Sequence, residues 1–357
     1  MIKKAILCFS LLAITFYSYS QAPKYSNEFL SIGVGARAMG MGNAQTAICN
    51  DATSAFWNPA GLTRIDSDKQ ISLMHAEYFA GIAKYDYGTF AAPIDATRTV
   101  AFSVIRFAVD DIIDSTELID ANGNIDYDRL KTFSVADYAF LISYAQTTKK
   151  EGLRVGGNAK IIHRKAGDFA KAWGFGIDLG AQYDKGKWQF GLMGKDITGT
   201  FNAWSFNTED LEEVFAQTGN EIPQNGLEVT LPKLIASAAY VGKINEKFGW
   251  KAVADLDITF DGKRNVLVKS DPVSVDPHAG IEIDYRDFIF LRGGVNNIQK
   301  VLEIDNSEST VSQPNIGLGV KIKNITLDYA LTNIGSDVKL YSNIFSLKWN
   351  IYKKEKN

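Results

Sequence analysis

FLSIGVGARAMGMGNAQTAICNDATSAFWNPAGLTRI, residues 29–65, decides the fold because it lacks the strand-like alternation of the residues that follow it. Glycines recur among its small residues, at Gly33, Gly35, Gly40, Gly42 and Gly61. Glycine lets backbone pack closely against other backbone or adopt positive φ. Pro59 favours an extended conformation at Asn58, so a helix that begins near Asp51 must stop there. The segment is predicted to form a compact plug, with a tight turn before the first strand.

Part of this segment resembles a known family. The run from Ser31 to Arg37, the Gly40-Met41-Gly42 run and above all SAFWNPAGL, residues 54–62, are similar to the N-terminal signature of the PorV/PorQ family of outer-membrane proteins. That family is related to the FadL long-chain fatty acid transporters. The resemblance implies a FadL-like barrel in the outer membrane of a Gram-negative bacterium, with residues 21–66 as a hatch inside it. The hatch motif would be Trp57, Asn58, Pro59, Ala60 and Gly61.

Residues 1–20 have the features of a cleaved secretory signal peptide. Lys3 and Lys4 precede an apolar run, and small residues lie just before residue 21. Cys49 is then the only cysteine of the mature chain, so no internal disulfide can stabilise it. No later stretch has the roughly 20 apolar residues of a spanning helix, so a membrane protein with this sequence must cross by strands.

From residue 69 onward, apolar and polar residues alternate with period 2, as in strands with one apolar face. Aromatic residues end several of these faces, Trp173 and Tyr183 among them, as in the girdles of membrane barrels. A soluble β-sandwich also alternates, but its strands average about 5 to 6 residues, and several segments here are longer. Fourteen strands are predicted, at residues 68–79, 84–94, 97–108, 136–147, 152–164, 171–184, 187–195, 231–242, 247–260, 276–286, 288–294, 312–323, 324–333 and 337–351.

The connections between these segments are short at one end and long at the other. Those after even-numbered segments are short, whereas those after odd-numbered segments include long loops, at about residues 109–135, 196–230, 261–275 and 295–311. This asymmetry is typical of an antiparallel up-and-down outer-membrane barrel. We therefore expect an all-β transmembrane barrel of about fourteen strands at residues 67–352 and a short basic tail at residues 353–357. Both termini would lie in the periplasm and the long loops outside.

The sequence offers no pattern for catalysis, metal binding or a cofactor. His75, His163 and His278 fall on different predicted strands without a cysteine partner. The glycine pairs within residues 33–42 follow no strand, and no Gly-x-Ser-x-Gly occurs. The acidic stretch 110–126 lacks the closing glutamate of a calcium loop, which favours a solvated turn. The mature net charge of about −5 argues against a nucleic-acid partner. We expect a non-enzymatic protein.

The longest loop, residues 196–230, is the predicted contact with a protein partner. Residues 207–215 begin with a cap residue and acids and have one apolar face, which predicts a short amphipathic helix. Large aromatic residues nearby are of the kind that anchor interfaces. The candidate contacts are Phe201, Trp204, Phe206, Leu211 and Phe215.

Two functions fit this fold. The PorV/PorQ resemblance implies an accessory subunit of a surface-protein secretion or assembly machine, of the type IX kind, whose extracellular loops contact other outer-membrane or secreted proteins. The FadL resemblance implies a transporter of hydrophobic small molecules that lies among outer-membrane lipid. The predicted inward faces carry Arg154, Lys160, Asp178, Asp255, Asp257, Glu282 and Asp284. An apolar route is expected to have an apolar lining, so we rank the accessory subunit first.

Overall fold

The computed structural model describes residues 26–116, 118, 123–207, 225–302, 307–333 and 341–353. The predicted signal peptide and nearly all of the predicted tail lie outside these ranges. The predicted helix at residues 207–215 also lies outside them, apart from its first residue.

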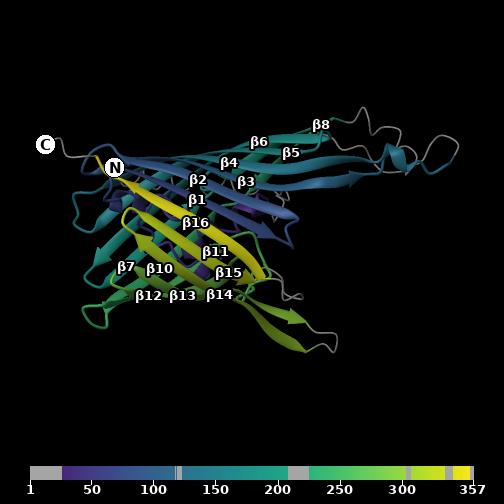
Figure 1. The fold of residues 1–357 in the computed structure, drawn as a ribbon. Helices are drawn as coiled ribbons and strands as arrows, with labels where there is room; N and C mark the ends of the chain where they lie inside the picture. The colour runs from purple at the N-terminus through teal and green to yellow at the C-terminus, as the bar shows by residue number, and fades with distance from the viewer. Residues whose placement is uncertain are drawn as a thin grey trace, which may run out of the picture.

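Among the described residues, fourteen antiparallel strands form a closed barrel, which confirms the predicted fold class (Figure 1). Each strand of the ring pairs with its neighbours in chain order, β7 is followed by β10, and β16 closes the ring on β1. The ring consists of β1 (Lys69–Tyr78), β2 (Ala83–Pro93), β3 (Arg98–Asp114), β4 (Lys131–Thr147), β5 (Leu153–Ala166), β6 (Ala170–Lys185), β7 (Trp188–Lys195), β10 (Lys233–Lys243), β11 (Phe248–Thr259), β12 (Ser274–Tyr285), β13 (Ile289–Leu302), β14 (Glu308–Ile322), β15 (Ile325–Asn333) and β16 (Tyr341–Ile351).

The predicted loop at residues 196–230 is partly strand, and the prediction was wrong there. β8 (Thr200–Phe206) pairs with β6, and β9 (Gly226–Thr230) pairs with β8. The physical reason is the unequal length of β6 and β7, which have 16 and 8 residues. Residues 179–185 of β6 bond to β7, and its other half would have unpaired backbone groups without β8.

Two of the other predicted long loops, at residues 109–135 and 295–311, are shorter than expected because their flanking strands continue. β3 and β4 have 17 residues each, so the acidic residues from Asp110 to Asp114 lie in a strand and not in a turn. β13 and β14 likewise extend into residues 295–311. These long strands project beyond the barrel at one end, here called the long-hairpin end (Figure 1). The opposite end, with connections such as β6–β7 and β10–β11, is called the short-turn end.

The alternation in sequence sets which side chains face outward. In β6, Leu179 is 54% exposed whereas its neighbour Asp178 is 2% exposed. Exposed apolar residues occur on the outer face of every part of the ring, for example Leu73, Phe102, Ile142 and Leu291. This outer face suits a hydrocarbon environment and the polar inner face does not.

The N-terminal segment, residues 26–66, packs against the inner face of the barrel (purple in Figure 1). It contains only short helical turns, η1 (Glu28–Leu30), α2 (Ala36–Gly40), α3 (Ser54–Trp57) and η2 (Pro59–Arg64), and a further turn, η3 (Tyr127–Arg129), lies between β3 and β4. α3 ends at Asn58, whose φ of −165° and ψ of 104° are extended, so the predicted stop before Pro59 is confirmed. No helix in the described ranges is long and apolar enough to cross a membrane.

Glycines in the inner wall let this segment approach the strands. A Cβ atom at Gly294 of β13 would overlap the backbone of Met41 and Gly42, whereas at Gly293, on the outer face, it would lie 4.0 Å from a methyl group of Ile281. A side chain at Gly294 would therefore displace the backbone of the N-terminal segment, whereas a side chain at Gly293 would not.

We predict that Gly294→Val displaces the N-terminal segment and that Gly293→Val does not. Overpacking of this kind typically costs about 1–3 kcal/mol, and the displaced segment would uncover Cys49, which is fully buried. Burial also raises the pKa of the Cys49 thiol to about 12, so the parent reacts slowly. The measurement is maleimide labelling of Cys49 in the folded barrel. Equal labelling rates in the two variants would contradict the prediction.

Candidate functional site

The backbone of the N-terminal segment is bound by side chains of the barrel wall. The amides of Gln45 and Thr46 donate to one carboxylate oxygen of Asp255 at 3.1 and 3.0 Å, and the amide of Ala47 donates to the Ser237 hydroxyl at 3.1 Å. Further wall side chains that bond to segment backbone are Gln70, Asn158, Gln182 and Ser346. Irregular backbone in the barrel thus finds the partners that buried amides and carbonyls require.

The predicted hatch motif connects this segment to β6. The Asn58 amide nitrogen donates to the carbonyls of Ala181 in β6, at 3.0 Å, and of Thr46, at 3.2 Å, while its oxygen accepts from the amide of Ala60. Trp57 Nε1 donates to the Val34 carbonyl at 2.9 Å. Gly61 lies so close to the Cys49 carbonyl that a Cβ atom would overlap it. Each of these contacts is specific to its residue type.

Ion pairs also join the segment to the wall, toward the short-turn end. Glu282 of β12, 1% exposed, accepts from Arg37 Nε of the segment at 3.0 Å, from Arg292 Nε at 2.7 Å and from Lys251 Nζ at 2.7 Å. Asp51 of the segment pairs with Lys348 of β16 at 3.1 Å. A cavity of about 230 Å³ lies among these charged side chains.

Asp51 lies in the segment and not in a strand of the wall. Burial alone would raise the pKa of Asp51, but the charges of Lys348 and Arg37, with a hydrogen bond from Thr53, lower it to about 2. Asp51 is therefore a carboxylate at neutral pH and contributes to holding the segment in place.

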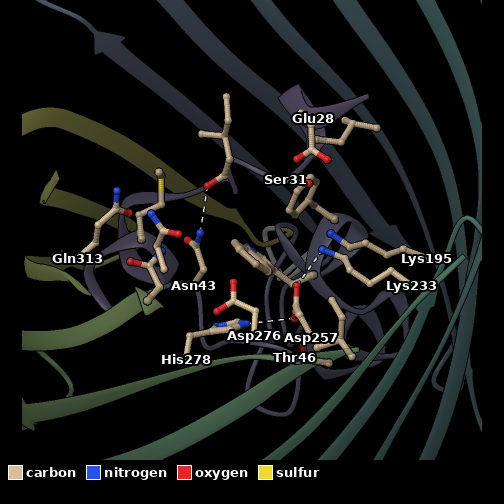
Figure 2. A pocket seen from close by; sticks show the side chains of 18 of the residues that line it. Glu28, Ser31, Asn43, Thr46, Lys195, Lys233, Asp257, Asp276, His278 and Gln313 are labelled. Carbon is tan, nitrogen blue, oxygen red and sulfur yellow. Dashed lines mark hydrogen bonds and ion pairs between the residues drawn. The ribbon is translucent and has the colours of Figure 1, made fainter. Parts of the chain in front are cut away.

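A larger cavity, of about 390 Å³, lies on the other side of the segment, toward the long-hairpin end (Figure 2). Its apolar lining comes mainly from the segment, through Leu30, Ile32, Met39, Phe56 and Trp57, with Ile235 from the wall. Its polar lining comes mainly from the wall, through residues that include Lys195, Lys233, Asp257, Asp276, His278, Asn296 and Gln313. A ligand in this cavity would contact an apolar surface on one side and a polar surface on the other.

Most charged groups around this cavity are paired. Lys233 Nζ lies 2.8 Å from one oxygen of Asp257, and His278 Nε2 lies 3.1 Å from the other (Figure 2). The Lys195 ammonium lies 4.1 Å from the centre of the Phe56 ring and 5.8 Å from that of Trp57, within cation–π range. The cavity is thus built from both the segment and strands β7, β10, β11 and β12.

The inward-facing charges were predicted correctly, but the inference that they exclude an apolar ligand was wrong. Lys160 pairs with Asp178 at 2.8 Å, Arg154 pairs with Asp184 at 2.7 Å, and Glu282 and Asp255 bind the segment. These charges neutralise one another or satisfy the segment, so they do not exclude an apolar ligand. No pattern in the sequence pointed to the cavity itself, because its apolar side comes from a segment far from the wall strands in the chain.

The predicted partner contacts that are described lie around β8. Phe201 is 41% exposed, whereas Trp204 donates from Nε1 to Glu228 of β9 at 2.6 Å and lies 5.0 Å from the Arg164 guanidinium. Phe206 stacks on Trp204 at 6.0 Å. Leu211 and Phe215 lie outside the described residues. A role in binding a partner stays a prediction for this group.

The three histidines do not converge. His75 lies on the outer face beside Asp86, at 2.7 Å, His163 stacks on Trp173 at 4.2 Å, and His278 faces the cavity. Within the described part of the chain, no group of three His, Cys, Asp or Glu residues is placed to hold a metal ion.

Known proteins share the fold of this chain but not its sequence. No family model matches the chain, and no curated protein matches it in sequence. The P. putida toluene transporter TodX is similar over 90% of this chain and 99% of its own, with a TM-score of 0.58 and 14% identity. The monoaromatic hydrocarbon channel CymD is similar over 90% and 98% (TM-score 0.56, 13% identity), and a Pseudomonas aeruginosa FadL homologue over 89% and 98% (TM-score 0.52, 12% identity). At these identities the likeness shows a FadL-like fold.

This finding corrects the ranking of functions made from the sequence. The similar structures are named as channels and transporters of hydrocarbons, so the expectation of an accessory subunit of a secretion machine is wrong. The PorV/PorQ resemblance itself has no support from these comparisons. The error arose because the polar inward faces were taken to exclude an apolar route, whereas many of these side chains bind the N-terminal segment.

We predict that Glu282→Gln lowers the free energy of unfolding by about 3–5 kcal/mol, because removing one partner leaves buried cations uncompensated. Thermal or urea unfolding in detergent measures the effect. The matched control is Asp287→Asn, whose pair with Lys321 is exposed to solvent and should contribute less than about 1 kcal/mol. Similar losses in both variants would contradict a special role for the Glu282 cluster.

We further predict that Asp51 contributes stability that is lost in acid. Because its folded pKa lies below the value of 3.8 for a free side chain, the contribution is complete above about pH 4 and disappears as the pH falls toward 2. Unfolding midpoints of the parent and Asp51→Asn, measured between about pH 6 and pH 2.5, should therefore converge as the pH falls. A constant difference across this range would contradict the assignment.

Proposed function

We propose that this chain is an outer-membrane channel through which apolar small molecules cross, using the cavity of about 390 Å³ as a binding site on the way. The observation that carries the proposal is the apolar side of that cavity, formed by Ile32, Phe56 and Trp57 inside a barrel with a FadL-like fold. Its volume falls within the roughly 300–1,000 Å³ of pockets that hold small ligands. The proposal involves no enzymatic step and no cofactor.

In this proposal, residues 21–66 are the hatch. The segment separates the cavity toward the long-hairpin end from the charged cavity toward the short-turn end, and it binds the wall through Asn58, Arg37 and Asp51. The long-hairpin end faces outward and both termini lie in the periplasm of a Gram-negative bacterium, because long loops on the outer side are the usual orientation of such barrels. Outer-membrane lipid surrounds the apolar outer face.

A ligand has two ways to leave the cavity under this proposal. One is displacement of the hatch. The other is lateral, near β9, where a second small cavity of about 60 Å³ shares Phe56, Lys195 and Lys233 with the first and is also lined by Thr230 and Leu231. Within the described ranges β9 pairs only with β8, so its other edge is not closed by β10.

We predict that Ile235→Trp, which places an indole in the cavity, abolishes uptake of toluene or a similar apolar probe by cells that express the protein. Ile235 is 3% exposed and lines the cavity. Leu234→Trp is the matched control, because the adjacent side chain of β10 points to the outer face. Uptake at the parent level in Ile235→Trp, with the protein folded in the outer membrane, would refute the cavity as the route.

A further inference from the structure

Among the described residues that line the cavity, two side chains of opposite charge, Asp276 and Lys195, form no ion pair. Asp276 of β12 has neither an ion pair nor a hydrogen bond within the described part of the chain, and its Oδ1 is buried. Lys195 of β7 contacts only the rings of Phe56 and Trp57 through its ammonium, again among the described residues. Uncompensated charges in a secluded site are costly unless something pairs with them. These two side chains are therefore available to a ligand.

The neighbouring charged side chains already have partners and are not available to a ligand in the same way. Asp257 is occupied by both Lys233, at 2.8 Å, and His278, at 3.1 Å. Glu28, at the rim, pairs with Arg264 at 3.5 Å. Among the described residues, Asp276 and Lys195 thus differ from the other charged residues of the lining because they form no ion pair. Figure 2 shows both side chains directed into the cavity.

The strand register gives the spacing of the two charges. Asp276 pairs with Asp257, Asp257 with Ile235, and Ile235 with Met193, which is two residues before Lys195 in β7. Three strand spacings of about 4.8 Å place the two backbones roughly 14 Å apart along the wall. Both side chains reach inward, so the charges of a bridging ligand must be separated by several bonds. The apolar side chains of Ile32, Met39 and Trp57 line the same cavity.

We propose that the preferred ligand is a zwitterionic single-chain amphiphile, with its cationic group on Asp276, its anionic group on Lys195 and its chain against the hatch. This inference rests on the proposed function and adds the class of ligand. A single chain is favoured because a cavity of about 390 Å³ is near the small end of the range for ligand pockets, roughly 300–1,000 Å³.

The test uses four decyl probes that differ only in the head group: a sulfobetaine, a primary amine, a carboxylate and an alcohol. Affinities are measured by titration calorimetry at about pH 7.5, below the micellar concentration of each probe, for the parent, Asp276→Asn and Lys195→Gln. The parent should bind the sulfobetaine most tightly. Each substitution should weaken sulfobetaine binding about tenfold or more, because Asp276→Asn removes the charge that faces the quaternary ammonium and Lys195→Gln removes the charge that faces the sulfonate.

The single-charge probes give the specific pattern. Binding of the amine should weaken only in Asp276→Asn, and binding of the carboxylate only in Lys195→Gln. The alcohol should bind all three proteins with the same affinity, which shows that each is folded. If the sulfobetaine binds no tighter than the alcohol, or if the carboxylate binds tightest, the zwitterion proposal is wrong and the transport proposal stands. If none of the four probes binds the parent, the proposed function fails with it.

Discussion

Irregular backbone inside a barrel must have its polar groups satisfied, and much of this structure follows from that requirement. Residues 26–66 contain only short helical turns, so many of their amides and carbonyls have no partner within the segment. The inner wall supplies those partners through Asp255, Ser237 and Asn158. The inner wall is thus polar because it binds the backbone of the N-terminal segment. The outer wall has no such backbone to bind and is apolar.

Two devices fix the segment in one position. Glycines in the wall, such as Gly294, leave room for its backbone, and the buried Glu282 attracts Arg37 of the segment together with two wall cations. Buried ion clusters of this kind contribute little net stability but strongly disfavour arrangements in which one partner is missing. The cluster therefore favours the position of the segment in which Arg37 reaches Glu282.

The same arrangement divides the lumen chemically. Toward the short-turn end the segment presents Arg37 and Asp51 to a charged cavity, and toward the long-hairpin end it presents Phe56 and Trp57 to a mixed one. A ligand that rests on the aromatic side would meet a charged barrier beyond it. Lys195 and Asp276, which form no ion pair with any described residue, lie on the aromatic side, where a head group can be desolvated together with its chain.

The sequence by itself determined the barrel, because period-2 alternation sets which face of each strand is apolar, and the unequal lengths of the connections can be read directly along the chain. It also located the stop at Asn58 and the inward faces of Asp178 and Glu282. Only the tertiary structure decided that Glu282 binds the N-terminal segment, since its partner Arg37 is 245 residues away in the chain. It also decided that β8 pairs with β6 and that the cavity is lined by both the N-terminal segment and the wall, because both depend on which distant surfaces meet.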